Sequence, residues 1–297
     1  MAEKIKVACV GLNVVDCYEH QNKAYPGGNE FNVSIFARRL GAESAFIGCF
    51  GSDFYSGANY GIACSENVDL SHSRFYNDEC GIAAVTLVNG DRVFIGGNHG
   101  GVTGRYPVCI NEEDLSFLLK YDIVVSDRYS RMDSAEFKKI YDAGIPLAYD
   151  FGDEEVDRLA EAIFPYCRYA FFSCSHRGKE EILQLLKNAC DLGASCCIAT
   201  LGEKGAMAYM KEIGRPVSVA AREGTILDTM GAGDSFLAAF IVHVLREYKG
   251  NVGKKEELIN CMESGVGFAA ENCRFYGSIG LGLPYPIGNV KKSIQMK

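Results

Sequence analysis

Short apolar runs alternate with amphipathic segments along most of the chain. Three of the amphipathic segments have apolar residues at helical spacing and end at glycine, at Gly41, Gly144 and Gly193. Eight apolar runs have the length of β-strands: Ile5–Val10, Ala45–Cys49, Ile123–Val125, Leu147–Tyr149, Tyr169–Phe172, Cys196–Thr200, Ala206–Met210 and Pro216–Val219. The first six are almost continuously apolar, as in strands of a parallel sheet that are buried on both faces. The pattern therefore predicts an open α/β sheet with right-handed crossovers.

Part of the first hundred residues departs from this alternation. The runs Ile82–Val88 and Arg92–Ile95 flank Asn89-Gly90, which predicts a hairpin because a type I′ turn needs positive φ at both central residues. Together with Val14–Tyr18, these runs predict a small β-element apart from the main sheet. The glycine-rich stretch 96–101 that follows is either a hinge or a backbone that lies close to a ligand.

Composition bounds the domain organisation. The chain has 297 residues, of which 48% are hydrophobic and 23% charged, so it has ample material for a core. It has no internal repeat, low-complexity tract or proline-rich linker. We therefore expect residues 1–297 to form one domain, with the small β-element contributed by about 12–25 and 80–102.

Charge and hydropathy limit the partners. The 38 acidic and 30 basic residues give a net charge of −8, which argues against a sequence-independent grip on DNA or RNA. Only four apolar residues lie between Lys6 and the first glycine, too few for a signal peptide. No run approaches the ~18 apolar residues of a membrane span. We therefore expect a soluble, cytoplasmic protein with neither a nucleic-acid nor a membrane partner.

Thirteen cysteines are scattered along the chain without any C-x-x-C pair. This excludes a zinc knuckle and a thioredoxin-type redox motif. Many lie in apolar runs, such as Cys9 and the adjacent Cys196 and Cys197, where cysteine behaves as a small hydrophobic residue. Reduced, buried thiols in a cytosolic protein are the expectation.

The sharpest motif is Asp228–Phe236, DTMGAGDSF, which opens a strongly apolar helix. Gly231 and Gly233 lack Cβ atoms, so a ligand can approach the backbone there. The N–H groups of the first helical turn would point toward that ligand, with the positive end of the helix dipole behind them. The motif therefore predicts an anion-binding loop, although Asp234 alone could also be a helix cap. The chain contains neither a P-loop nor a G-x-G-x-x-G motif.

A second group of polar residues lies near the N-terminus. Asn13 and Asp16 follow the first predicted strand, and PGGNEFN, residues 26–32, opens the first amphipathic helix. Open α/β sheets bind ligands at the carboxyl ends of their strands, so Asn13, Asp16 and Asn32 could hydrogen-bond vicinal hydroxyls of a ligand. Asn29 is either part of this site or the N-cap of the helix. For a later helix we expect Ser134 as the cap.

Four motifs, in this order, resemble those of the ribokinase-like, or PfkB, family of carbohydrate kinases. They are PGGNEFNVSIFARRLG from Pro26, Gly51–Gly57, Thr200–Gly205 and Asp228–Phe236. The resemblance extends over nearly the whole chain. It implies a three-layer α/β/α fold with a mostly parallel central sheet and a small β-lid. It also implies an enzyme that transfers the γ-phosphoryl group of ATP to a sugar hydroxyl.

The same resemblance implies roles for individual residues. Asp234 corresponds to the general base that takes the proton of the sugar hydroxyl, and Gly231, Ala232 and Gly233 correspond to the anion hole. The implied sugar contacts are Asn13, Asp16, Gly27, Gly28 and Asn32. The implied nucleotide contacts are Thr200, Gly202, Gly205, Asp228, Thr229, Asn272 and Gly277.

One departure from the family concerns the metal. The family commonly has an N-x-x-E after a middle strand, where it helps to organise the Mg²⁺ shell. Here the stretch reads FSCSHRGKEE, and the asparagine is missing. Glu180 is the expected metal ligand, with Glu181 as the alternative, unless both are exposed acids in a first helical turn. ATP and Mg²⁺ are the implied cofactors, and a monovalent cation such as K⁺ is left open.

Several strings resemble the branch of the family that phosphorylates the 6-hydroxyl of fructosamines such as fructoselysine. They are Gly11–Asp16, Asn22–Asn29, Asp91–Phe94 and Tyr121–Val124. Arg92 would then pair with the carboxylate of the attached amino acid, unless it is a cross-strand surface charge. The alternatives are a fructokinase or other sugar kinase, a nucleoside kinase, and a catalytically degenerate sugar-binding protein. Because family members often dimerise through their lids, a homodimer of this kind is possible here.

Overall fold

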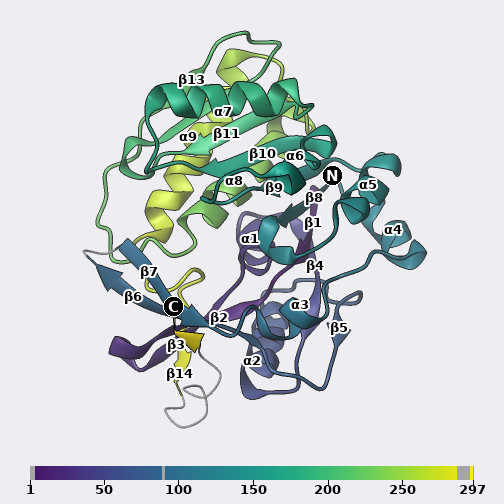
Figure 1. Ribbon diagram of the computed structural model, residues 1–297, viewed down its shortest axis with the longest axis vertical. Helices are drawn as coiled ribbons and strands as arrows, with labels where there is room; N and C mark the ends of the chain where they lie inside the picture. Colours follow the sequence, from purple (N-terminus) through teal and green to yellow (C-terminus); the bar gives the residue numbers. More distant parts are fainter. Residues whose placement is uncertain (1–3, 89–90, 286–294, 297) are drawn as a thin grey trace.

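The main sheet is mostly parallel in the computed structural model of the protein, which describes residues 4–88, 91–285 and 295–296 (Figure 1). In spatial order, its nine described strands are β13 (Val217–Val219), β12 (Ala206–Tyr209), β11 (Cys196–Thr200), β10 (Cys167–Ser173), β9 (Leu147–Asp150), β8 (Ile123–Asp127), β1 (Lys6–Gly11), β4 (Glu43–Phe50) and β5 (Arg74–Phe75). All neighbours from β11 to β5 are parallel. Strands β12 and β13 are antiparallel additions. Each of the eight predicted runs falls on one of these strands, and the six continuous ones are all parallel.

Helices cover both faces of this sheet. Those in the described part of the chain are α1 (Asn29–Arg39), α2 (Phe54–Ser65), α3 (Gly101–Arg105), α4 (Glu112–Leu118), α5 (Ser134–Asp142), α6 (Arg158–Glu161), α7 (Lys179–Asp191), α8 (Ala232–Tyr248) and α9 (Lys255–Asn272). None of the described helices is long and apolar enough to cross a membrane.

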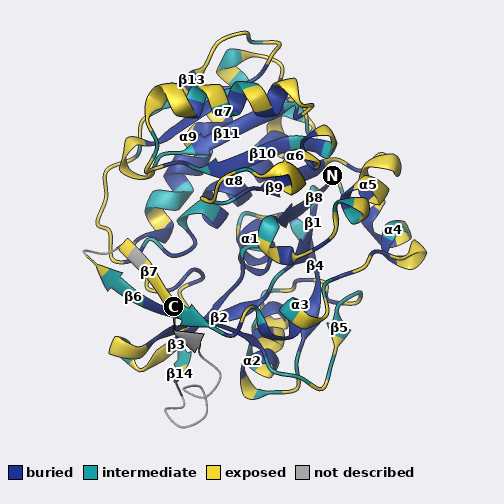
Figure 2. Ribbon diagram, viewed as in Figure 1, coloured by how far each residue is buried: buried dark blue, intermediate teal, exposed yellow. Residues whose placement is uncertain are grey.

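Two apolar cores lie on opposite faces of the sheet, because neighbouring side chains of a strand point in opposite directions. In β1, Val7 and Cys9 pack in the core formed with α1, α8 and α9. Ala8 and Val10 pack in the other core, to which α4, α5 and α7 contribute. Figure 2 shows the buried strands between helices whose outer faces are exposed. This arrangement confirms the predicted three-layer α/β/α fold.

A second, six-stranded sheet lies apart from the main one, at the lower left of Figure 1. In spatial order, its strands are β14 (Leu283–Pro284), β3 (Lys23–Gly27), β2 (Val14–Tyr18), β6 (Gly81–Val88), β7 (Asp91–Gly97) and β15 (Gln295–Met296). We call this the lid sheet. Its four longer strands fall almost entirely within the two segments expected for a lid, whereas the pattern gave no sign of β14 and β15. The predicted Asn89-Gly90 turn lies outside the described residues.

One predicted helix cap is wrong by one residue, and for Asn29 the structure excludes one of the two alternatives, that of an N-cap. Asp133, rather than Ser134, caps α5, because its extended backbone lets the carboxylate accept a 2.9 Å hydrogen bond from the Ala135 amide. Gly28, rather than Asn29, is the N-cap of α1. Its φ of +102° is a conformation that favours glycine over any residue with a side chain.

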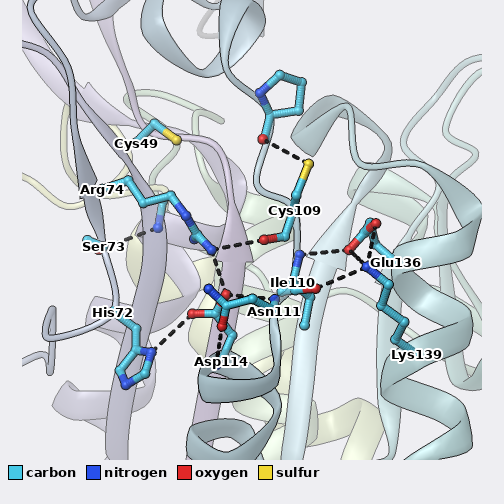
Figure 3. A network of polar contacts seen from close by, with 12 residues as sticks. Cys49, His72, Ser73, Arg74, Cys109, Ile110, Asn111, Asp114, Glu136 and Lys139 are labelled. Atoms are coloured by element: carbon cyan, nitrogen blue, oxygen red, sulfur yellow. Dashed lines mark hydrogen bonds and ion pairs between the residues drawn. The ribbon is translucent and has the colours of Figure 1, made fainter.

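A polar network attaches the β5 edge of the main sheet to helices α4 and α5 (Figure 3). Asp114, a buried acid of α4, accepts a 2.5 Å hydrogen bond from Arg74 Nη2 and lies 3.0 Å from His72 Nδ1. In α5, Glu136 accepts a 2.7 Å bond from the Ile110 amide. The network therefore fixes the edge strand to the helical layer beside it.

Candidate active site

The site forms at the carboxyl edge of the main sheet, where β1 and β8 are neighbours. The chain leaves β1 toward β4 on one side and returns to β8 on the other, so the strand order reverses there. Such switch points are where open α/β sheets bind ligands. The first turns of α1 and α8 meet at this edge, and the lid sheet contacts the loop before α8.

Asp234 and Asn32, both predicted from their motifs, are in direct contact. They lie 202 residues apart in the sequence, in the first turns of α8 and α1, and Asn32 Nδ2 donates a 2.7 Å hydrogen bond to Asp234 Oδ2. Asn32 Oδ1 accepts a 2.8 Å bond from the Ser278 hydroxyl, so the orientation of its amide is fixed. Asp234 is 7% exposed. The arrangement holds one nearly buried carboxylate in a defined orientation at the sheet edge.

The loop before α8 has the form of an anion hole. Gly231 is the N-cap of this 17-residue helix, with a φ of +72°, and a Cβ there would lie 2.5 Å from that of Ser278. At Gly233, by contrast, a Cβ would meet no atom within 4 Å, so open space adjoins the first helical turn. The Gly233 amide has no hydrogen-bond partner among the described residues. An open space beside helix N-terminal amides is well suited to a phosphoryl group.

Asp228, a predicted nucleotide contact, is completely buried. Its carboxylate accepts hydrogen bonds from the Tyr18 hydroxyl at 2.7 Å, the Gly277 amide at 2.8 Å and the Met230 amide at 2.9 Å. It thus joins lid strand β2, the segment after α9 and the anion-hole loop. This geometry gives Asp228 and Gly277 a positioning role, and their contact with a nucleotide stays a prediction.

Two more predicted residues hold the anion-hole loop from either side. The Thr229 hydroxyl donates a 2.8 Å hydrogen bond to Asp91 at the start of lid strand β7. Asn272, the last residue of α9, donates a 3.2 Å bond to the Met230 carbonyl. The loop is therefore attached both to the lid sheet and to the main domain.

On the sugar side, two glycines make room for other groups. A Cβ at Gly27 in β3 would overlap the carboxylate of Asp16, which comes from the neighbouring strand β2. A Cβ at Gly28 would overlap the Leu12 carbonyl. Asp16 is buried, and these glycines allow its carboxylate and the chain after β1 to lie against the start of α1.

Asn13 is placed differently from the prediction. Its side chain is completely buried, and Nδ2 donates a 2.6 Å hydrogen bond to the Cys49 carbonyl at the end of β4. Asn59 Nδ2 of α2 lies 3.4 Å from its Oδ1. Both Nδ2 and Oδ1 of Asn13 therefore have partners within the protein, and this placement does not favour the predicted sugar contact.

The predicted nucleotide loop is a tight turn after β11. Gly202 and Gly205 have φ of +60° and +93°, and the Leu201 amide donates a 2.8 Å hydrogen bond to the Gly205 carbonyl. A Cβ at Gly205 would overlap the Val219 carbonyl, so glycine is required there. Thr200 ends the strand and accepts a 2.8 Å bond from the Cys174 amide. The turn thus lies at the same carboxyl edge of the main sheet.

The metal and lid predictions have less support. Glu180 is exposed in the first turn of α7, and no group of three or more His, Cys, Asp or Glu gathers for a metal in the described part of the chain. The Arg92 side chain lies outside the described residues. Its backbone pairs with Leu87 in the β6–β7 hairpin. Both roles therefore stay predictions.

Sequence reasoning missed a pair of buried acids at this edge, Glu30 and Asp127. Glu30 stands inside PGGNEFN, and Asp127 ends an apolar strand. Burial raises the pKa of Glu30 to about 7 and that of Asp127 well above its usual range. Each acid stands within an otherwise apolar or glycine-rich stretch, and this was the one sign of burial in the sequence. The contact between Glu30 and Asp127 depends on the tertiary fold.

Comparison with known proteins agrees with this geometry. The sequence matches the family described as pfkB family carbohydrate kinase over residues 4–130 and 167–284. It is 34% identical over 282 residues to the fructosamine kinase FrlD of Bacillus subtilis (strain 168), covering 95% of each chain. Fructoselysine 6-kinase of Escherichia coli (strain K12) is 34% identical over 241 residues, covering 79% of this chain and 87% of that one. The structure of Arabidopsis thaliana ribokinase complexed with ribose and ATP superposes with a TM-score of 0.77 at 21% identity, covering 93% of this chain and 95% of that chain.

The fold, the four motifs and these similarities agree. The match spans most of the chain, and the prediction made from the motifs is confirmed. This protein belongs to the pfkB family of carbohydrate kinases and is a sugar kinase.

Proposed function

We propose that this protein transfers the γ-phosphoryl group of ATP to the 6-hydroxyl of a fructosamine such as fructoselysine. The observation that carries the chemistry is the Asn32–Asp234 contact beside the open space at Gly233, since it places an oriented carboxylate next to an anion hole. The two 34% identical relatives, a fructosamine kinase and a fructoselysine 6-kinase, support the choice of substrate.

Asp234 serves as the general base in this proposal. It takes the proton of the sugar hydroxyl while that oxygen forms a bond to the γ-phosphorus, and the bond to the β–γ bridging oxygen breaks as ADP leaves. Asn32 orients the carboxylate through its 2.7 Å hydrogen bond. The first-turn amides of α8 stabilise the charge on the transferred group, which is the main demand of phosphoryl transfer.

ATP would carry Mg²⁺ into this site on its phosphates. The described residues do not gather a complete ligand set for it. Mg²⁺ commonly binds through substrate phosphates with only one or two carboxylates, and Glu180 is the carboxylate proposed here. Bound Mg²⁺ neutralises part of the phosphate charge. A K⁺ ion near the anion-hole loop is a further element of the proposal, tested by replacing K⁺ with tetramethylammonium in the assay.

Arg92 recognises the amino-acid part of the substrate. Its strand, β7, reaches the anion-hole loop through the Asp91–Thr229 hydrogen bond, which supports a position of this strand over the sugar. A guanidinium and a carboxylate form a strong bidentate pair. A fructosamine would then be distinguished from fructose by a charge that fructose lacks.

The working state proposed is a cytoplasmic homodimer joined through the lid sheets. Val88, Val93 and Phe94 are exposed on the β6–β7 hairpin, and an apolar surface on an open sheet is typical of an interface. Buried free thiols such as Cys9 and Cys197 suit a reducing compartment. Light scattering on the purified protein tests the dimer, and Phe94→Lys is expected to give monomers.

A substrate screen tests the proposed function. ADP release is measured with ATP and each of fructoselysine, fructose, ribose and adenosine, and kcat/KM is expected to be highest for fructoselysine. A preference for fructose or ribose would make the protein another sugar kinase, and turnover of adenosine alone would make it a nucleoside kinase. Sugar binding without turnover would indicate a degenerate sugar-binding protein.

A further inference from the structure

Glu30 fills the space beside the end of β1. It is the second residue of α1 and 1% exposed, and its Oε2 accepts a 2.9 Å hydrogen bond from the Leu12 amide. A Cβ at Gly11 would overlap its carboxyl group, so glycine there makes room for it. Glu30 therefore joins the first turn of α1 to the chain leaving β1.

The other oxygen of Glu30 faces a second buried acid. Asp127, 1% exposed at the end of β8, accepts a 2.7 Å hydrogen bond from the Ser130 amide through Oδ1, and its carboxyl group contacts that of Glu30 at hydrogen-bonding distance. Glu30 Oε1 and Asp127 Oδ2 are buried and have no donor among the described residues. Within that part of the chain, neither acid forms an ion pair.

Electrostatics require a proton between the two groups. Two carboxylates in contact, shielded from water and without a cation, cannot both stay ionised, whereas one shared proton gives an O–H···O hydrogen bond. The neighbouring acids Asp150 and Asp234 raise the pKa of the pair further, and Arg128, a cation beside it in the described part of the chain, pairs with Glu154 at 2.9 Å. The titratable groups that interact with the pair or lie beside it are Cys9 on β1, Arg128 and Tyr129 after β8, Tyr149 and Asp150 on β9, and Asp234 on α8.

We propose that Glu30 and Asp127 share one proton in the working enzyme and act as positioning residues for Asp234. The inference rests on the proposed role of Asp234 as the base. Glu30 and Asn32 lie in the same helical turn, and Asn32 holds Asp234. With the proton present, the pair attaches α1 to β8. Without it, two buried anions repel each other and displace the turn that carries Asn32.

The two groups of acids act on opposite limbs of the pH profile. Asp234 must be ionised to accept a proton, so its protonation lowers activity at acidic pH. The Glu30–Asp127 pair must keep its proton, so its ionisation lowers activity as the pH rises. We expect kcat/KM to fall about tenfold per pH unit once the pair is ionised.

The test compares Glu30→Gln with Glu30→Ala. A glutamine can keep the contact with the Leu12 amide and donate to Asp127, so we expect activity within about threefold of wild type at pH 7 and no fall at high pH. Asp127→Asn should also remove the fall. Glu30→Ala should lower kcat/KM at every pH. The exposed acid Glu113, also in a first helical turn, is the matched control, and Glu113→Gln should keep the wild-type profile.

A spectroscopic measurement tests the pair without any assay of activity. The infrared spectrum of the folded, substrate-free protein at pH 6 should contain the C=O band of a protonated carboxyl group, which disappears at high pH and in both neutral variants. If this band is found but no sugar is phosphorylated, the proposed function fails and the proton-sharing pair stands. A Glu30→Gln profile with an unchanged high-pH fall would overturn the positioning role. Absence of the band, with melting temperature raised by added K⁺, would replace the proton with a bound cation.

Discussion

The Thr229 hydroxyl donates a 2.8 Å hydrogen bond to Asp91, so the anion-hole loop and lid strand β7 are directly linked. The phosphate side and the sugar side of the site therefore share a contact. Closure of the lid sheet and the shape of the anion hole are expected to depend on one another.

Thr229→Val tests this link. Valine keeps the shape and removes the donor, so the lid closes less often and KM for the sugar should rise about three- to tenfold. The free energy of unfolding should change by less than about 0.5 kcal/mol, because the bond is exposed. Thr225→Val, in the exposed segment before the motif, is the control and should leave KM unchanged. An unaltered KM in Thr229→Val would show that closure of the lid sheet does not depend on this hydrogen bond.

Asp234→Asn tests the general base. The amide has almost the same shape but cannot take a proton, so kcat should fall by about 10²–10⁴ while sugar binding persists. Rapid-quench kinetics and isothermal titration calorimetry measure the two quantities. Asp133→Asn, which keeps a good helix cap on α5, should have full activity. Comparable rates for the Asp234 variant and wild type would rule out this assignment.

Gly231→Ala and Gly233→Ala should fail in different ways. At Gly231 the positive φ and the Cβ of Ser278, 2.5 Å from the position of an added Cβ, predict a loss of at least about 1–3 kcal/mol in stability. At Gly233 the added methyl would enter the open space of the anion hole. The melting temperature of Gly233→Ala should stay near that of wild type, while its KM for ATP rises. Urea denaturation together with ATP titration separates the two effects, and equal loss of stability in both would contradict the geometry.

Tyr18→Phe probes the buried carboxylate of Asp228. The substitution removes one of three donors to a completely buried group, so unfolding should become easier by about 1.5–3 kcal/mol. The lid strand β2 also loses its attachment to the anion-hole loop, so KM for the sugar should rise as well. Tyr141→Phe on the exposed side of α5 serves as the control for denaturation. A stable Tyr18→Phe protein would mean that another donor replaces the hydroxyl.

The acid pair predicts a pH dependence of stability as well as of rate. The folded pKa of Glu30 is raised to about 7 from an unfolded value near 4.3, so the folded state holds a proton that the unfolded state releases. This contribution to stability is therefore complete below about pH 4 and is lost as the pH rises through about 7, by about 4 kcal/mol in all. Melting temperatures from pH 5 to 9 should show this decline in wild type but not in Glu30→Gln. A parallel decline in the variant would assign it to other groups.

The sequence predicted the elements better than the contacts. Continuous apolar runs such as Cys196–Thr200 indicated buried parallel strands because burial on both faces leaves no polar alternation. The anion-hole loop was predictable because Gly231 and Gly233 act through local backbone geometry. By contrast, the completely buried side chain of Asn13 and two of the three bonds of Asp228 depend on segments distant in sequence, as with Tyr18, 210 residues away from Asp228.

The same reason explains the missed pair and the cap of α1. The one local bond of Asp127, from the Ser130 amide, is an ordinary cap and does not signal a buried pair, and the parallel arrangement of β1 and β8 brings Glu30 and Asp127 together. The cap of α1 depends on the approach of Gly28 to the Leu12 carbonyl, a contact made across the lid and not within the helix.

The short strand β14 has a consequence for how the protein is made. Leu283 and Pro284 pair with Ala24 and Lys23, so this edge of β3 has no such neighbour until Leu283 and Pro284 have left the ribosome. Strands that are far apart in the sequence pair late in folding. Until then the open edge of β3 can pair with a strand of another molecule. The main sheet can assemble first from adjacent units, and the lid sheet is completed last.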